Sequence, residues 1–388
     1  MDKILVIDDD NKKRSEVVSN LRRQLQQDSV EVVEVDDSVC ETLLKPSEKV
    51  GANNSTEKQF ERYLTDNPDI KLVVVDHDLS GYNSKLSESV VSDACKLAGV
   101  PHCRYSRVMS KQTPRQRIKE LVQRAHLYSA KLDLKGTGNE DIELIPEDIV
   151  RIHSIYLGFE ELRERINKLE KQDFVNEDNT RKDIVDIATE ILDKDDMEPI
   201  LSGYARSFNL YGDYVELLEA IDNENSDEDS VILKFKTGLA YLIGFWLYNS
   251  VLKFPGVILK SEAAASYLDL NYDDFIENKQ QFNSALYTGP FSQKTKYEFW
   301  WRFDLDDILI DEEVDSGYQL LLKKGIECKQ SACLECGESA GYFCLVKEAP
   351  VCKKHSIGAL DWMPRGADLS RIATEAYELY HPYLESKN

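Results

Sequence analysis

The sequence contains no apolar run long enough to cross a membrane. Its best candidate, 237–252, has 16 residues and includes Asn249 and Ser250, whereas a membrane-spanning helix needs about 20 predominantly apolar residues. We therefore expect a buried helix there and no membrane partner. The opening segment MDKILVIDDD carries acidic residues where a secretory signal would have its apolar core. We accordingly expect a cytoplasmic protein.

Basic residues are scarce relative to acidic ones. The chain has 48 Lys and Arg against 71 Asp and Glu, which gives a formal net charge of -23. DNA-binding proteins neutralise phosphates with Lys and Arg, so this balance argues against direct DNA binding and favours protein partners.

Recognisable enzyme motifs are also missing. The sequence has neither a Walker loop nor a GxGxxG turn, and no histidine belongs to a familiar nucleophile motif. A protein that is not a turnover enzyme is therefore favoured. An enzyme whose site lies in the helical region and uses an unrecognised motif stays open as an alternative.

The length favours two or three domains, because a single core rarely serves 388 residues. Residues 1–135 alternate short apolar strands with helical stretches, which predicts a doubly wound α/β domain with a parallel sheet. Strands are predicted at 4–7, 30–35 and 72–75, and an amphipathic helix at 11–27.

Three further parts are predicted after the α/β domain. Residues 136–180 form a linker whose segment 149–169 has the periodicity of a long amphipathic helix. This helix either packs on a neighbouring domain or pairs two chains in a homodimer. Residues 181–320 are mainly helical by pattern, and 321–388 hold a metal-binding module and a C-terminal helix.

Acidic residues directly follow two of the predicted strands. Asp8 and Asp9 come after the strand at 4–7, and Asp76 follows the strand at 72–75. Ligands of open α/β sheets bind beyond the carboxyl ends of the strands, so we expect these carboxylates to lie together. Carboxylate oxygens suit Mg²⁺, and a bound Mg²⁺ can hold a phosphoryl group. The alternative is that strand-end acids only cap helices.

Three motifs resemble the receiver domain of bacterial response regulators, the proteins of two-component signalling. They are KILVIDDD at 3–10, LVVVDHDLSG at 72–81 and VPHCRYS at 100–106. The resemblance is confined to the N-terminal part of the chain, and its first two motifs are the more specific ones. It implies a receiver or flavodoxin-like fold for 1–135.

The resemblance also implies a set of functional residues. Asp8 and Asp9 would help bind Mg²⁺, and Asp76 would accept phosphate from a histidine kinase. The peptide carbonyl of Asp78 would be a further Mg²⁺ ligand. Ser106, 30 residues after Asp76, would sense the phosphate at the end of the fourth strand.

The chain departs from the family pattern after Ser106. The family has Lys followed by Pro at the end of its fifth strand, and no Lys-Pro follows Ser106 here. Lys131 is one stand-in for that lysine and Lys111 is another. Ser80 occupies the place of the family's proline before the glycine turn. These departures leave open a non-phosphorylated receiver-like scaffold or adaptor.

Cysteines concentrate near the C-terminus in the pattern of a metal site. Cys333-x2-Cys336 is followed after 15 residues by Cys352-x2-His355. Two close ligand pairs across a short loop are typical of tetrahedral Zn²⁺, and four protein ligands indicate a structural site. Cys344 lies in an apolar run and is predicted to be a core cysteine.

Together these patterns predict a response-regulator-like signalling protein. A kinase would phosphorylate Asp76 with bound Mg²⁺, and the change near Ser106 would alter how the helical and zinc-bearing parts engage a downstream protein partner. The scaffold and the unrecognised enzyme are the two alternatives.

Overall fold

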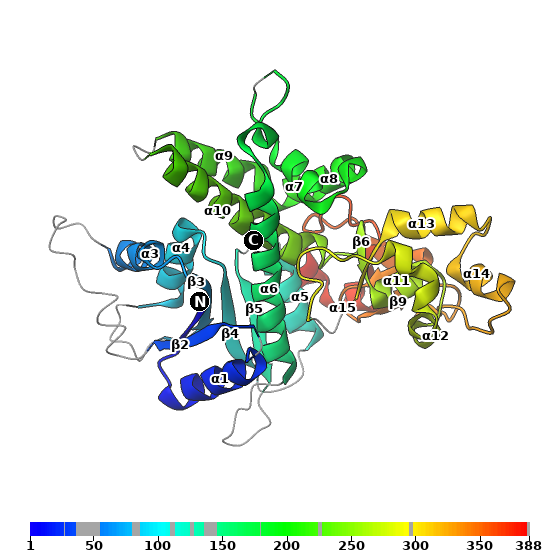
Figure 1. Cartoon of the computed structure of the whole chain (residues 1–388). Coiled ribbons are helices and arrows are strands. Elements are labelled where there is room, and N and C mark those ends of the chain that lie inside the picture. Colours follow the sequence, from blue (N-terminus) through cyan, green and yellow to red (C-terminus); the bar gives the residue numbers. More distant parts are fainter. Residues whose placement is uncertain are drawn as a thin grey trace.

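The structure is a computed structural model that describes residues 1–26, 28–35, 55–79, 86–108, 113–124, 128–135, 146–178, 180–223, 227–294 and 298–385. The chain forms a parallel sheet with its helices, a mostly helical middle part and a C-terminal part with a cysteine and histidine cluster (Figure 1). This arrangement confirms the predicted fold class at that level. The predicted boundary at 136–141 lies outside the described residues.

The N-terminal part contains a five-stranded parallel sheet in the order β2-β1-β3-β4-β5. Its strands are β1 (Lys3–Ile7), β2 (Glu31–Val35), β3 (Ile70–Asp76), β4 (His102–Val108) and β5 (Ala130–Lys135). The apolar residues of β1 and β3 are buried on both faces, as expected of central parallel strands. The predicted strands are therefore present, and β5 is a strand that the sequence pattern did not reveal.

Helices cover both faces of this sheet. They are α1 (Asn11–Gln24), α3 (Thr56–Asp66), α4 (Glu88–Ala98), α5 (Pro114–Arg124) and α6 (Pro146–Lys168). Alternate residues of β1 enter two cores: Ile4 and Val6 share one with α1 and α6, and Leu5 and Ile7 share the other with α3 and α4.

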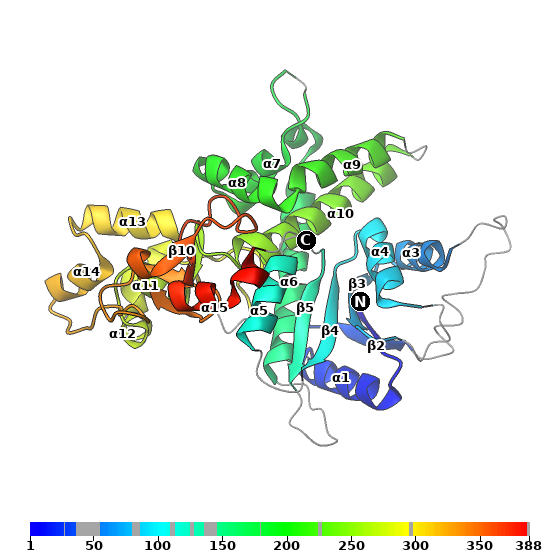
Figure 2. The ribbon, with the colours of Figure 1, turned by 180° about the vertical axis from the view of Figure 1, so that it is seen from behind.

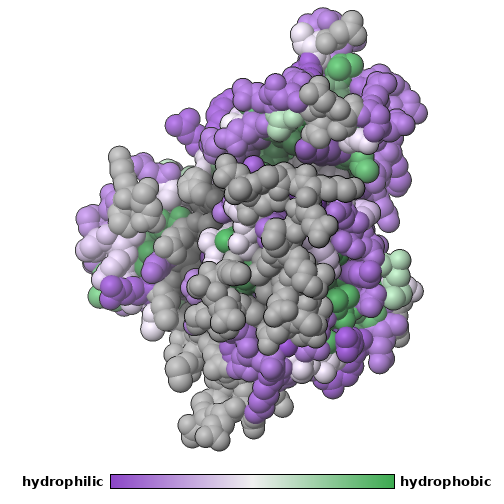
Figure 3. Space-filling model, turned by 90° about the vertical axis from the view of Figure 1, so that its left-hand side faces the viewer, coloured by the Kyte–Doolittle hydropathy of each residue, from purple (hydrophilic) through white to green (hydrophobic). Residues whose placement is uncertain are grey.

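On the side that faces left in Figure 1, the described surface is mainly hydrophilic, with only small hydrophobic areas (Figure 3).

The long amphipathic helix is present as α6, and its apolar side is buried within the chain. Ile155, Phe159, Leu162 and Ile166 are each at most 1% exposed. They contribute to the core that α6 shares with α1 and with α10 (Glu228–Trp246). The apolar side chains that suggested a homodimer are therefore already used for packing inside one chain.

The middle part consists mainly of helices around α6 and α10 (Figure 1). The others are α7 (Ile184–Leu192), α8 (Glu198–Phe208) and α9 (Leu210–Asp222), and α10 continues into a π-helical turn at Leu247–Val251. Among the described residues, one helix, Glu228–Val251, has the length and hydropathy of a membrane span, with half of its apolar window buried inside the protein. Phe245, for example, is fully buried against Phe159 of α6. This is the packing of the predicted buried helix.

The C-terminal part combines two small sheets with short helices. Its strands are β6 (Ile258–Lys260), β7 (Phe299–Trp301), β8 (Tyr342–Cys344), β9 (Ala349–Val351), β10 (Ser356–Gly358) and β11 (Ser370–Ala373). Its helices are α11 (Ser261–Tyr267), α12 (Tyr272–Glu277), α13 (Arg302–Asp311), α14 (Gly317–Lys323) and α15 (Thr374–Leu384). The main sheet has the order β10-β11-β8-β9.

The C-terminal part rests on α5 of the N-terminal part. Helix α15 packs beside α5 (Figure 2). Arg117 of α5 donates from Nε to the Leu345 carbonyl at 2.7 Å and forms an ion pair with Glu348. Leu345 and Glu348 lie in the turn between β8 and β9, so this hairpin, as well as α15, contacts α5.

Candidate functional sites

Three carboxylates meet at the carboxyl edge of the parallel sheet. β1 and β3 are neighbours in register, with Ile7 opposite Val75, so both strands end at the same place. Asp8 and Asp9 directly follow β1, and Asp76 is the last residue of β3. One oxygen from each of these three carboxylates lies within 4.8 Å of the others. The structure thus brings together the three residues that the sequence predicted as a group.

Asp8 is buried and held by hydrogen bonds to both carboxylate oxygens. The Tyr105 hydroxyl donates to Oδ2, and the Asp10 backbone N–H donates to Oδ1 at 2.8 Å. Burial raises the pKa of the Asp8 carboxyl above its ordinary value, and the nearby Asp76 charge adds to that rise, while the two hydrogen bonds and Lys13 oppose it. A cation bound here would offset the cost of keeping Asp8 charged.

Asp76 is 4% exposed and forms an ion pair with the first turn of α1. Lys13 Nζ lies 3.2 Å from Asp76 Oδ2. Helix α1 begins directly after the acids, and Asp10 caps it by accepting from the backbone N–H groups of Lys12 and Lys13 at 3.0 and 3.2 Å. The helix-cap alternative therefore holds for Asp10, whereas Asp8 and Asp76 belong to the cluster.

Sequence reasoning missed two residues of this site, Tyr105 and Lys13. Tyr105 pairs with Asp76 across β3 and β4, which brings its hydroxyl to Asp8. Its only sequence signal was its place immediately before the predicted Ser106. Lys13 had a weak signal as well, because it lies one helical turn beyond Asp9, where a side chain can reach back over the strand end.

Ser106 and Lys131 are described in the backbone only. Ser106 lies opposite Asp133 of β5 and two positions before the end of β4 at Val108, so it does not end the strand as the resemblance implied. Lys131 is the second residue of β5, opposite Arg104, and the residue at the end of that strand is Lys135. The roles expected for Ser106 and Lys131 remain predictions.

Two other predicted residues also remain untested. Asp78 is exposed, two positions beyond the end of β3. Its expected contribution is a backbone carbonyl, whose direction toward a cation nothing in the structure tests. Lys111 lies outside the described residues.

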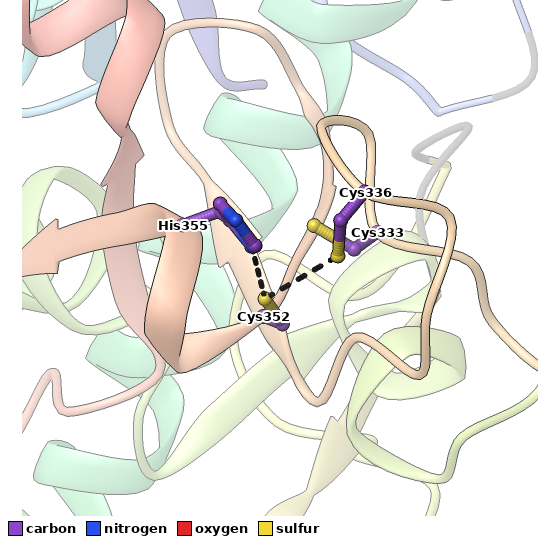
Figure 4. Close-up of side chains that lie close together, drawn as sticks. All are labelled: Cys333, Cys336, Cys352 and His355. Carbon is purple, nitrogen blue, oxygen red and sulfur yellow. Dashed lines mark hydrogen bonds between the residues drawn. The ribbon is translucent and has the colours of Figure 1, made fainter.

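A second cluster contains the four predicted zinc ligands, which point toward one another (Figure 4). Ligand atoms of Cys333, Cys336, Cys352 and His355 all lie within 4.8 Å of one another. The Cys336 and Cys352 sulfurs are 3.8 Å apart, and Cys352 Sγ is 3.2 Å from His355 Nδ1. Two thiolates bound tetrahedrally at about 2.3 Å from a zinc ion would be roughly 3.8 Å apart. The spacing of the cluster therefore fits such an ion.

The local fold explains how ligands distant in sequence meet. Gly337 adopts a φ of +75°, which favours glycine, and donates its N–H to the Cys333 carbonyl at 2.9 Å to close the first ligand turn. The Leu334 N–H donates to the Pro350 carbonyl at 2.9 Å and ties that turn to β9, which leads directly into Cys352. This backbone hydrogen bond thus holds the first ligand turn next to the strand that leads into the second ligand pair.

Backbone N–H groups also surround the sulfur of Cys333. Burial raises the pKa of this thiol, but hydrogen bonds from the backbones of Cys336, Cys352 and Glu335 lower it, and the net pKa lies below the ordinary value. Such bonds favour the thiolate, which is the form that binds metal. The donor set therefore suits a thiophilic cation.

Cys344 lies outside this cluster, as predicted. It is fully buried, and its sulfur accepts from the backbone N–H groups of Lys347 and Ala373 at 3.3 and 3.2 Å. These bonds join the β8–β9 turn to the end of β11. Cys344 is therefore a core residue of the C-terminal sheet.

No protein-family model, curated protein or solved structure matches the chain. The receiver resemblance thus remains a prediction from the sequence motifs. The structure adds a parallel α/β sheet with grouped carboxylates at its carboxyl edge, the edge at which such sheets bind ligands.

Proposed function

We propose that this chain is a response-regulator-like signalling protein in which Asp76 accepts a phosphoryl group. The observation that carries this proposal is the convergence of Asp8, Asp9 and Asp76 within 4.8 Å at the carboxyl edge of the sheet. Three adjacent carboxylates repel one another, and a hard cation such as Mg²⁺ offsets that repulsion. Asp8, Asp9 and the Asp78 carbonyl are the proposed Mg²⁺ ligands together with Asp76.

The chemistry follows from the arrangement of these groups. The Asp76 carboxylate is the nucleophile, and a cation bound by its neighbours would neutralise the phosphoryl oxygens during transfer. Both oxygens of Asp8 accept hydrogen bonds, so its carboxylate is fixed in direction before any ligand arrives. A histidine kinase is the proposed phosphodonor, since the motifs resemble those of two-component receivers.

The output would pass through α5 to the C-terminal part. Helix α5 follows β4, the strand that carries Ser106, and contacts the β8–β9 turn through Arg117. A rearrangement at the end of β4 would therefore shift the support on which the C-terminal part rests. We propose that this shift changes how the helical and C-terminal parts engage a downstream protein.

The second cluster is proposed to be a structural zinc site. Three thiols and one imidazole supply four protein ligands, which close a tetrahedral sphere and leave no position for a substrate. The site would stabilise the β8–β9 hairpin, which contacts α5. Mg²⁺ at the acidic edge and Zn²⁺ at the cysteine cluster are therefore assigned separate roles.

Mass spectrometry of the intact protein tests the phosphoacceptor. With Mg²⁺ and acetyl phosphate we expect one phosphorylated species. It should disappear in Asp76→Asn, because an amide is not a nucleophile, while Asp9→Asn should need more Mg²⁺. The exposed Asp66→Asn at the end of α3 is a matched control and should behave as the wild type. Absence of any phosphorylated species, even with a cognate kinase and excess Mg²⁺, would contradict the proposal.

A docking scaffold that is never phosphorylated is the second candidate. One observation favours it: Lys13 pairs with Asp76, so the chain itself supplies a positive charge to one of the three carboxylates. In a scaffold this pair would serve stability alone. The same mass-spectrometry experiment separates the two candidates, because the scaffold predicts no modification of Asp76.

A further inference from the structure

We propose that Lys13, in the first turn of α1, supplies the cation that binds the phosphoryl group on Asp76. This inference rests on the proposed function and extends it to a residue that the sequence motifs did not indicate. Lys13 Nζ is 3.2 Å from Asp76 Oδ2. The side chains are 16% and 6% exposed, so the pair is shielded from solvent more than a surface ion pair would be.

The local structure fixes the position of Lys13 from both sides. On one side, Asp10 caps α1 and accepts the backbone N–H of Lys13 itself. On the other, the buried Arg14 donates from Nη1 to the Asp8 carbonyl at 2.6 Å, which ties the first helical turn to the end of β1. Arg14 Nε also lies 3.4 Å from Glu34 Oε1, so its charge is paired with a carboxylate of β2.

The charge change during transfer explains what Lys13 would do. An Asp76 oxygen attacks the phosphorus of acetyl phosphate, the bond from phosphorus to the acyl oxygen breaks, and acetate leaves with the electron pair. No proton has to move. The carboxylate, a monoanion, becomes an acyl phosphate dianion, and the ammonium of Lys13 can shift from Oδ2 to a phosphoryl oxygen because its stem is flexible.

Lys13 should therefore weaken the binding of the divalent cation and strengthen the binding of the phosphoryl group. It repels an incoming divalent cation and competes with it for Asp76 Oδ2 before transfer. After transfer it attracts the phosphoryl oxygens. Loss of a residue with only a structural role would weaken the binding of both ligands. Opposite changes in the two affinities would therefore identify the proposed role of Lys13.

The experiment uses the full chain and two single substitutions of neighbouring lysines. Lys13→Met removes the ammonium next to Asp76, and Lys12→Met removes the same charge from the same helical turn but leaves the pair of Lys13 with Asp76 intact. Beryllofluoride binding with saturating Mg²⁺ is followed by ¹⁹F NMR. Binding of Mn²⁺ alone is followed by electron paramagnetic resonance.

We expect Lys13→Met to weaken beryllofluoride binding about tenfold to a hundredfold, the range of a hydrogen bond to a charged group. The same variant should bind Mn²⁺ about threefold to tenfold more tightly, because a nearby positive charge is gone. Lys13→Arg should keep most of the beryllofluoride affinity. Lys12→Met should leave both affinities close to those of the wild type.

The outcomes separate this inference from the function on which it rests. If the wild type binds no beryllofluoride with Mg²⁺, the proposed function fails and the inference fails with it. If the wild type binds it and Lys13→Met binds it equally well, the inference alone is overturned. A loss confined to Lys131→Met or Lys135→Met would overturn it too, by assigning the cation to β5.

Discussion

The residue His102 shows how a single buried group can make the fold sensitive to pH. It begins β4, is fully buried, and has no hydrogen-bond partner for either ring nitrogen among the described residues. Burial, together with the nearby charge of Arg104, lowers the pKa of His102 to about 3. The ring packs edge-on against Phe245 of α10, so protonation would place a charge between the sheet and the helical part.

We expect His102→Leu to reduce the loss of stability on acidification. The folded-state pKa lies below the unfolded value of about 6.5, so the unfolded state binds the proton first, and stability is lost as the pH falls through that value toward 3. The cost is about 1.4 kcal/mol per pH unit, or roughly 2 kcal/mol between pH 6.5 and 5.

Urea unfolding at pH 7 and pH 5 measures this difference directly. The matched control is His381→Leu, which removes an exposed histidine of α15. It should keep the wild-type pH dependence. An unchanged difference between pH 7 and pH 5 in His102→Leu would show that this ring titrates normally in the folded protein.

Also at the residue scale, the sequence identifies those site residues whose neighbours follow from the order of parallel strands or from the spacing of a motif. Asp8, Asp9 and Asp76 could be grouped because the ends of parallel strands coincide. The zinc ligands could be grouped because their spacing is typical of metal sites. Tyr105 could not be assigned, since its contact with Asp8 joins residues 97 positions apart. Lys13 could not be assigned either, because its contact with Asp76 depends on how α1 lies over the end of the strands.

At the scale of elements, the central strands β1 and β3 and the edge strand β2 were predictable from their apolar pattern, whereas the other edge strand, β5, was not. β1 and β3 are buried on both faces and therefore appear as apolar runs. β5 has the sequence AKLDLK and lies at the edge of the sheet, so charged residues interrupt its apolar pattern. The helix α6 was predictable because its apolar residues recur at helical spacing over its whole length.

The contact between α5 and the β8–β9 turn can be tested by charge reversal. Arg117→Glu would place a negative charge beside Glu348 and remove the bond from Nε to the Leu345 carbonyl. We expect it to lower the free energy of unfolding by roughly 1–2 kcal/mol. Amide hydrogen exchange should rise in 342–351 and in α15.

The double variant Arg117→Glu with Glu348→Arg restores opposite charges at the same place. It should recover about 0.5 kcal/mol, a modest amount because the pair is partly exposed. The lost bond to Leu345 should not return. If hydrogen exchange in the hairpin is the same in all variants, α5 does not support this turn, and the proposed route of output through it is wrong.

At the scale of the whole molecule, the sequence predicted the parts but not how they are joined. Asn249 of the π-helical turn donates to the Ser129 carbonyl beside β5 at 3.0 Å, and Tyr241 of α10 donates to the Tyr128 carbonyl at 3.1 Å. These contacts join α10 to the parallel sheet. They involve single side chains from segments over 100 positions apart, for which a single sequence carries no periodic signal.

The group of four zinc ligands also affects the whole molecule, because it organises the C-terminal part and that part contacts α5. Elemental analysis should find about one Zn per chain, as four ligands close one site. Cys336→Ser or Cys352→Ser should lose the metal. Because metal binding contributes to folding, unfolding of the C-terminal part should separate from that of the sheet and begin at a lower temperature.

The Cys328→Ser variant is the matched control for the metal prediction. Cys328 precedes the same module, but its sulfur lies 3.9 Å from the Tyr318 carbonyl and outside the ligand group. This variant should keep the zinc and the single transition. Chelation of the wild type should reproduce the effect of Cys352→Ser. Hydrogen exchange should become faster first in the β8–β9 hairpin and then in α5, because α5 loses its contact with the ordered hairpin. A metal-free wild type that unfolds in one transition at the usual temperature would show that packing alone holds the C-terminal part.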